Sequence, residues 1–236
     1  MNNATLQLKL KQRLNKLDSQ DFDNIEPWQM IEAFNKAQVE WCRRNLHGGN
    51  MYKEGDEASK RRIDDLQILL REIPLTGTST ATYFQSNNFP DKDDYLEFKR
   101  VSSDASTECC PEPRSMTVYL AEEANVNLIL RDPLKKPSFE WGETFCTLIE
   151  GQLRIYREED FNIINPVLTY YKRPTYIEVA GIIDPYTGIA PAVDTDSEFK
   201  DDIVELFIDE AAAIIAGDIS NFNQQQLNQQ AAERSN

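Results

Sequence analysis

The stretch NIEPWQMIEAFNKAQVEWCRRNL, residues 24–46, is the clearest amphipathic segment of the chain. Its apolar residues recur every three or four positions, the spacing of a helix with one buried face. Pro27 suits the first position of a helix, where its missing N–H is not needed. The apolar face, which we assign to the core, consists of Trp28, Ile31, Phe34, Ala37, Trp41, Cys42 and Leu46.

Three further segments have helical periodicity. Leucines repeat over residues 5–17, and apolar residues line one side of residues 56–72, which Pro74 closes. Residues 195–217 begin with a Thr-x-x-Glu capping box and end at a glycine. We therefore predict a helical bundle made by an N-terminal part, residues 1–74, and completed by a C-terminal helix, residues 195–217.

Between the helical parts, residues 75–194 alternate apolar and polar side chains, which is typical of strands. Glu150-Gly151 between two such runs predicts a hairpin. Lys172-Arg173-Pro174 is expected to turn between the last two strands. The expected strands are 95–101, 115–121, 125–131, 138–149, 152–157, 167–171 and 175–179. The predicted fold is α+β, with an inserted antiparallel β-sandwich or small β-barrel domain.

The chain of 236 residues has a formal net charge of −15, and the acidic excess lies after residue 74. An acidic surface repels phosphate backbones, which excludes tight nucleic-acid binding but allows DNA to slide past. The sequence has no run of 18 apolar residues, so no membrane span is predicted, and the N-terminus lacks the apolar core of a signal peptide. We therefore expect no membrane association, and we expect the chain to stay in the cytosol where it is made.

Candidate chemical groups are few. Cys109 and Cys110 are neighbours, and the single histidine, His47, is far from them in sequence, which favours a plain loop over a zinc site. The acidic run 91–94 lacks the glycine and glutamate of a calcium loop and is interpreted as a solvated turn. His47 suits a helix C-terminus better than acid–base catalysis. No phosphate-binding or nucleophile motif occurs. We expect no catalytic residue, cofactor or metal.

Two segments are candidates for interactions. The run from Tyr170 to Tyr176 combines tyrosines with Lys172 and Arg173, which are residue types that contact nucleic acids, although a β-hairpin explains them equally well. The C-terminal segment 218–236 is rich in Gln and Asn and is expected to be a mobile arm that orders on a partner. The proposed contact residues are Tyr170, Tyr171, Lys172, Arg173, Phe222 and Leu227.

RLNKLDSQDFDNIEPWQMIEAFNKAQVEWCRRNLHG (residues 13–48) and DDIVELFIDEAAAIIAGDISNFNQQQLNQQAAERSN (residues 201–236) resemble the ends of head-to-tail connector proteins, the adaptor or ring proteins of short-tailed, crAss-like bacteriophages. YYKRPTYIEV (residues 170–179) is similar to a strand pair of such virion proteins. The resemblance implies a ring, commonly of twelve copies, between the portal protein and the next tail or ring protein. Such a ring lines the DNA exit channel of the virion and has no catalytic role.

Two other functions compete with the connector. A virion-associated hydrolase could use paired carboxylates of the β-domain, and Glu140, Glu143 and Glu158 are the residues to test. An acidic assembly adaptor, absent from the finished particle, would have the same composition. The sequence leaves both alternatives open.

Overall fold

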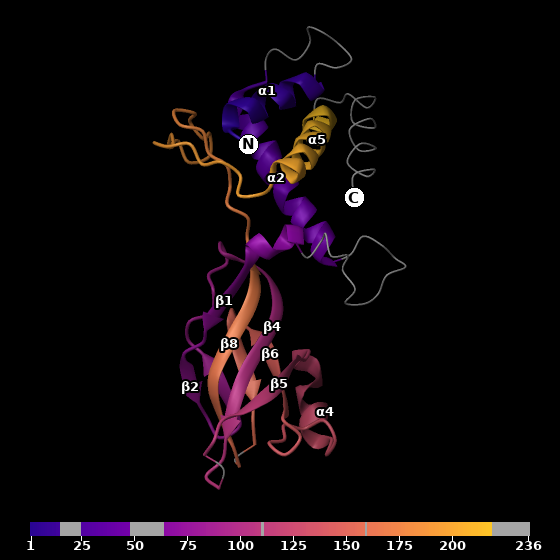
Figure 1. Ribbon diagram of the computed structural model, residues 1–236, viewed down its shortest axis with the longest axis vertical. Coiled ribbons are helices and arrows are strands. Elements are labelled where there is room, and N and C mark those ends of the chain that lie inside the picture. Colours follow the sequence, from indigo (N-terminus) through magenta and orange to yellow (C-terminus); the bar gives the residue numbers. More distant parts are fainter. Residues whose placement is uncertain (15–24, 48–63, 110, 159, 219–236) are drawn as a thin grey trace. The chain divides into compact units, whose positions relative to one another are not determined.

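The computed structural model describes residues 1–14, 25–47, 64–109, 111–158 and 160–218, and they form two compact units (Figure 1). Unit 1 comprises residues up to Ile68 and from Pro174 onward, and unit 2 comprises Leu69–Arg173. Unit 1 contains helices and unit 2 contains an eight-stranded sheet. The mixed α+β class predicted from the sequence is confirmed.

The described part of unit 1 is organised around the helix of residues 201–218. Helix α5 (Asp201–Asp218) packs against both α1 (Asn3–Leu14) and α2 (Pro27–His47), whereas α1 and α2 touch each other far less. Side chains on all sides of α5 are buried, as expected for a helix enclosed by its neighbours: Ile203, Val204, Phe207, Ile208, Ala211, Ala212, Ala213, Ile215 and Ala216. The centre of unit 1 is therefore α5 rather than α2.

An aromatic cluster joins α2 to α5. Phe207 is fully buried, and its ring lies 5.7 Å from that of Phe34 and 5.4 Å from that of Trp41, both edge to face. Phe199, just before α5, completes the cluster at 5.1 Å from Phe207. Edge-to-face pairs of this kind add to the free energy of burying the rings. The cluster fixes how the two helices cross.

Helix α1 attaches to α5 by leucines and ion pairs. Leu6, Leu10 and Leu14 are buried at four-residue spacing. Beside them Lys9 pairs with Glu205, and Arg13 Nε donates to Asp209 Oδ1 at 2.6 Å. Residues 15–17 of the predicted helix 5–17 lie outside the described residues.

Unit 2 is a single mixed sheet. Its order is β1-β8-β4-β5-β6-β7-β3-β2, and every neighbouring pair is antiparallel except β5–β6. The strands are β1 (Leu70–Pro74), β2 (Gly77–Ser79), β3 (Tyr83–Ser86), β4 (Tyr95–Ser106), β5 (Arg114–Leu120), β6 (Glu143–Ile149), β7 (Gln152–Tyr156) and β8 (Asn162–Lys172). The prediction of a purely antiparallel domain is wrong at β5–β6.

The sheet is curled, because its two edges are joined by only two residues. Leu75 and Thr76 separate β1 from β2, so the edges lie within roughly 11 Å of each other. Eight strands laid flat would span about 34 Å. Leu75 is buried among core residues from both halves of the sheet, including Phe84, Leu153 and Leu168. Unit 2 is thus a curled eight-stranded sheet.

A strand predicted over residues 125–131 is helical instead. These residues form a short 3₁₀ turn (Glu123–Asn125) followed by α4 (Val126–Arg131). Parallel strands need a crossover connection, and this segment supplies it between β5 and β6. Val126 and Ile129, three residues apart, pack on Phe145 and Tyr156. A short apolar run is compatible with the period of a helix or of a strand. Here the helix forms because this segment is the crossover between the parallel strands β5 and β6.

The structure also corrects the helix predicted over residues 56–72. Residues 56–63 lie outside the described part, a 3₁₀ turn covers Gln67–Leu69, and Leu70–Pro74 is strand β1, where Ile73 faces Leu168 of β8. The unit boundary accordingly falls at 68/69 rather than at 74/75. The second boundary falls at 173/174 rather than at 194/195, because Ile177 is buried in unit 1.

The capping box predicted at residue 195 does not cap a helix. Thr195 exchanges two backbone hydrogen bonds with Glu178, at 2.9 and 3.2 Å, and this pairing holds it in an isolated bridge. Helix α5 begins six residues later, where the Lys200 carbonyl accepts from the N–H groups of Ile203 and Val204. The hairpin at Glu150-Gly151 is confirmed, since both residues have positive φ, as a two-residue turn requires.

Substituting Phe207→Ala should lower the free energy of unfolding of unit 1 by about 3–5 kcal/mol, because the cavity opens at the centre of the aromatic cluster. Hydrogen exchange of α2 and α5 peptides, which separates unit 1 from unit 2, measures the loss. Ile183→Ala, at a side chain 61% exposed, is the control and should change it by less than about 0.5 kcal/mol. A loss below about 1 kcal/mol for Phe207→Ala would contradict the assigned core.

Glu210 makes the stability of unit 1 depend on pH. Burial raises the pKa of this carboxyl above its usual 4.5, and the nearby Arg44 opposes the shift. The folded chain therefore binds this proton more tightly than the unfolded chain, and stability falls as pH rises from 4.5 through the raised pKa. We expect the stability of the wild type relative to Glu210→Gln to fall over that interval, measured by urea denaturation. A difference that is constant or rises with pH would refute this. Glu123→Gln controls for net charge.

Candidate binding groove

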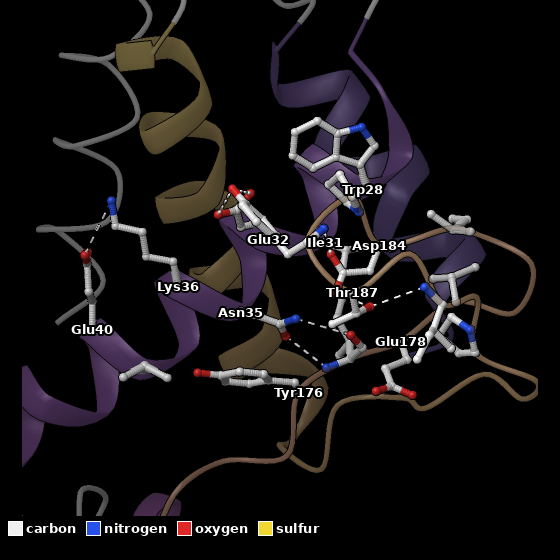
Figure 2. Close-up of a pocket in the computed structure, with 18 of the residues that line it drawn as sticks. Trp28, Ile31, Glu32, Asn35, Lys36, Glu40, Tyr176, Glu178, Asp184 and Thr187 are labelled. Carbon is white, nitrogen blue, oxygen red and sulfur yellow. Dashed lines mark hydrogen bonds and ion pairs between the residues drawn. The ribbon is translucent and has the colours of Figure 1, made fainter. Parts of the chain in front are cut away.

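A groove of about 820 Å³ lies in unit 1 between α2 and residues 176–191 (Figure 2). Helix α2 contacts two different surroundings through two neighbouring faces. One face, with Met30, Phe34 and Trp41, is buried in the core. The neighbouring face lines the groove through Trp28, Ile31, Asn35 and Val39, at spacings of three and four residues. The predicted single apolar face is thus divided, and its two tryptophans lie on different sides.

Side-chain amides of α2 hold the opposite wall at its base. Asn35 accepts from the N–H of Ile177 at 2.9 Å and donates to its carbonyl at 3.2 Å, as a neighbouring strand would (Figure 2). One turn further along α2, Gln38 donates to the Thr175 carbonyl at 3.0 Å. These bonds satisfy the polar backbone of a segment whose Ile177 side chain is buried. The strand predicted over 175–179 is wrong: the backbone of this segment is hydrogen-bonded by side chains of α2 instead of by a neighbouring strand.

The same wall is closed at its neck. Besides the Glu178–Thr195 bridge, Asn3 of α1 donates its amide to both of their carbonyls, at 2.9 and 3.2 Å. The backbone N–H of Asn3 donates to Asp196. Residues 179–194 therefore form a loop of unit 1 whose two ends are held together at the Glu178–Thr195 bridge.

The tip of this loop is folded by its own hydrogen bonds. The Asp184 carboxylate accepts from the N–H of Tyr186 at 2.9 Å and from the hydroxyl of Thr187 at 3.0 Å, an Asx-type turn. The N–H of Gly188, which has φ +69°, donates to the Asp184 carbonyl at 2.8 Å. Asp184 and Pro185 are the residue types favoured at the first two positions of a turn, so this turn can be predicted from the sequence.

Tyr186 connects the tip to α2. Its ring meets that of Trp28 edge to face at 6.5 Å, and its hydroxyl lies 3.3 Å from Glu32 Oε1, to which it donates. The negative charge of Glu32 raises the pKa of Tyr186, so the hydroxyl remains a donor. The tip is thereby held against the helix at its tyrosine.

The groove walls expose large apolar side chains, and most of the charged groups that line the groove are acidic. Tyr186 is 77% exposed and Ile189 69% exposed, and Tyr176 is nearly half exposed. Four carboxylates and two cations line the groove. They are Glu32, Glu40, Glu178 and Asp184 against Lys36 and Arg43, of which Lys36 pairs with Glu40 at 4.0 Å. An apolar surface of this kind, rimmed by polar groups, is typical of interaction sites.

The basic and aromatic run proposed as a contact patch is divided between the units. Tyr170 is buried in β8, where its hydroxyl donates to Asp94 and burial raises its pKa to about 12. Tyr171 and Lys172 follow it in the same strand, half-buried and paired in register with β1 or β4. The N–H of Arg173 donates to the Asp94 carbonyl at 2.6 Å. The expected hairpin with residues 175–179 is wrong, because β8 pairs with β1 and β4.

The other proposed residues are spread over the chain. Phe222, Leu227, Cys110 and the side chain of His47 lie outside the described residues, and Cys109 is exposed. Within the described residues, no group of three or more His, Cys, Asp or Glu is placed to hold a metal ion. Residues 91–94 form a turn, as interpreted, in which the Asp91 carbonyl accepts two N–H groups.

The glutamates named for a hydrolase have separate partners. Glu143 accepts from the Tyr119 hydroxyl at 3.2 Å, and Glu158 pairs with Lys136 at 2.8 Å. Glu140 is exposed. Each of the two engaged carboxylates thus interacts with a different element of unit 2.

Comparison of the sequence with protein-family models and with curated proteins gives no match. Among the helices of the described ranges, none is both long and apolar enough to cross a membrane.

Replacing Asn35 with Ala should loosen the groove wall. The substitution leaves the N–H and carbonyl of Ile177 without their partners, which costs about 1–3 kcal/mol locally. Hydrogen exchange should accelerate in peptides covering residues 175–191. Lys36→Ala is the matched control, since it removes only an exposed helical ion pair worth about 0.3–0.5 kcal/mol. Equal exchange in the two variants would show that Asn35 does not hold the wall.

Proposed function

We propose that this chain is a structural subunit of a connector ring in a short-tailed bacteriophage virion, without a catalytic role. The observation that carries the proposal is the preformed groove of unit 1, whose apolar walls are exposed although the loop that bears them is tied down at base, neck and tip. A folded surface of this kind serves assembly, because only a partner can remove its apolar area from water.

The resemblance to connector proteins agrees with the packing of unit 1. The two terminal stretches that carry it contain α2 and α5, and these helices pack together through Phe34, Trp41 and Phe207. In this proposal α1, α2 and α5 form the helical bundle of the subunit, and the curled sheet is its inserted domain. The two stretches that resemble connector proteins thus both belong to unit 1.

The ring has about twelve copies in this proposal and joins the portal protein to the next tail or ring protein. Its partners in the virion are protein surfaces, and the passing double-stranded DNA is not tightly bound. A net charge of −15 per chain supports this, since a strongly acidic channel repels phosphates and lets the duplex slide.

The purified chain should assemble into a closed ring whose mass is about twelve times 27.2 kDa, as expected of a head-to-tail interface that closes. Native mass spectrometry measures the mass, and electron microscopy tests for closure. Mass spectrometry of purified virions should find the chain at a matching copy number. An assembly adaptor would be absent from the virions, and a hydrolase would cleave cell-wall glycan. Either result, or a chain that is only monomeric and absent from particles, contradicts the connector role.

A further inference from the structure

Within the described residues, the groove of unit 1 is held by hydrogen bonds and its walls are exposed. Tyr186 and Ile189, which line it, are 77% and 69% exposed, whereas Asp184 and Thr187 between and beside them make the hydrogen bonds that fix the tip. A partner would therefore meet a preformed surface and would pay little ordering entropy on this side. This property suits a peptide segment that brings its own apolar anchors.

The charge of the groove limits the occupant. Its four carboxylates exceed its two cations, so an acidic segment is disfavoured. The sequence beyond α5, residues 219–236, carries one Glu and one Arg and is neutral, although the chain as a whole is acidic. Its Asn and Gln side chains can donate hydrogen bonds to carboxylates. Its large apolar residues are Ile219, Phe222 and Leu227.

A ring of identical subunits requires two different, complementary surfaces on each copy. The groove and the C-terminal segment form such a pair, since one is concave and apolar and the other supplies separate apolar anchors. The segment has 18 residues after Asp218, enough to span up to roughly 60 Å when extended. It is long enough to reach a neighbouring copy.

We propose that residues 219–236 of one copy dock in the groove of the neighbouring copy, with Phe222 and Leu227 as the anchors. This inference rests on the proposed ring and names the contact that joins its subunits. Phe222 and Leu227, five residues apart, would cover exposed walls such as Tyr186 and Ile189. The segment links copies head to tail, which a contact within one copy cannot do.

A matched pair of variants tests the groove. Ile189 and Val193 lie on the same loop and are 69% and 73% exposed, but only Ile189 lines the groove. Ile189→Asp should raise the concentration needed for half-assembly at least about 30-fold, because the carboxylate is buried against an apolar anchor. Val193→Asp should change it less than about twofold. Circular dichroism should be unchanged in both variants, and equal effects of the two on assembly would overturn the proposal.

A second experiment identifies the occupant in the full-length chain. A photo-reactive benzoylphenylalanine in place of Phe222 should cross-link to residues 176–191 or to α2. In a mixture of ¹⁵N-labelled and unlabelled chains, the linked peptides should include heavy–light pairs. Cross-links only within one copy, or only to other regions, would overturn the docking while a ring seen by native mass spectrometry keeps the connector role. If the wild-type chain forms no oligomer, both the docking proposal and the connector role are refuted.

Discussion

The packing of α5 against α2 is the constraint on which the rest of the structure depends. Phe207 lies between Phe34 and Trp41, although more than 150 residues separate the end of α2 from the start of α5 in sequence. Closing so long a loop costs conformational entropy. The sheet of unit 2 reduces this cost, because Leu70 at its start and Tyr171 near its end are register partners in adjacent strands. Pairing of β1 with β8 therefore brings together the two points at which the chain passes between the units, after Ile68 and before Pro174.

The same closure explains what the sequence could and could not predict. Helices such as α2 and α5 repeat their apolar residues over several turns, so their existence followed from periodicity. Residues 126–131 and 70–74 are too short for periodicity to decide. Their structures depend on pairing partners elsewhere, the crossover between β5 and β6 and the ladder with β8. Local signals at residue 195 failed similarly, because Thr195 pairs with Glu178 in a bridge and α5 begins only at Asp201.

The groove was missed for a related reason. Its wall is held by the amides of Asn35 and Gln38, which in sequence look like ordinary polar positions of an amphipathic helix. What sequence reasoning could have found is the loop tip, since Asp184-Pro185 followed by Gly188 specifies a turn. The exposed Tyr186 and Ile189 beside that turn were the available hint of a contact surface. Their apposition to Trp28 and Ile31 appears only once α2 is folded.

The division of α2 into two faces has a consequence for assembly. Its core face holds unit 1 together through Phe34 and Trp41, and its groove face is available without disturbing that core. Asn35 and Gln38 fix the loop wall to the helix by hydrogen bonds, whereas the tip of the loop is largely exposed. A partner that covers the tip therefore adds its apolar area to a surface already in place. In the proposed ring, folding and assembly thus use two neighbouring faces of one helix.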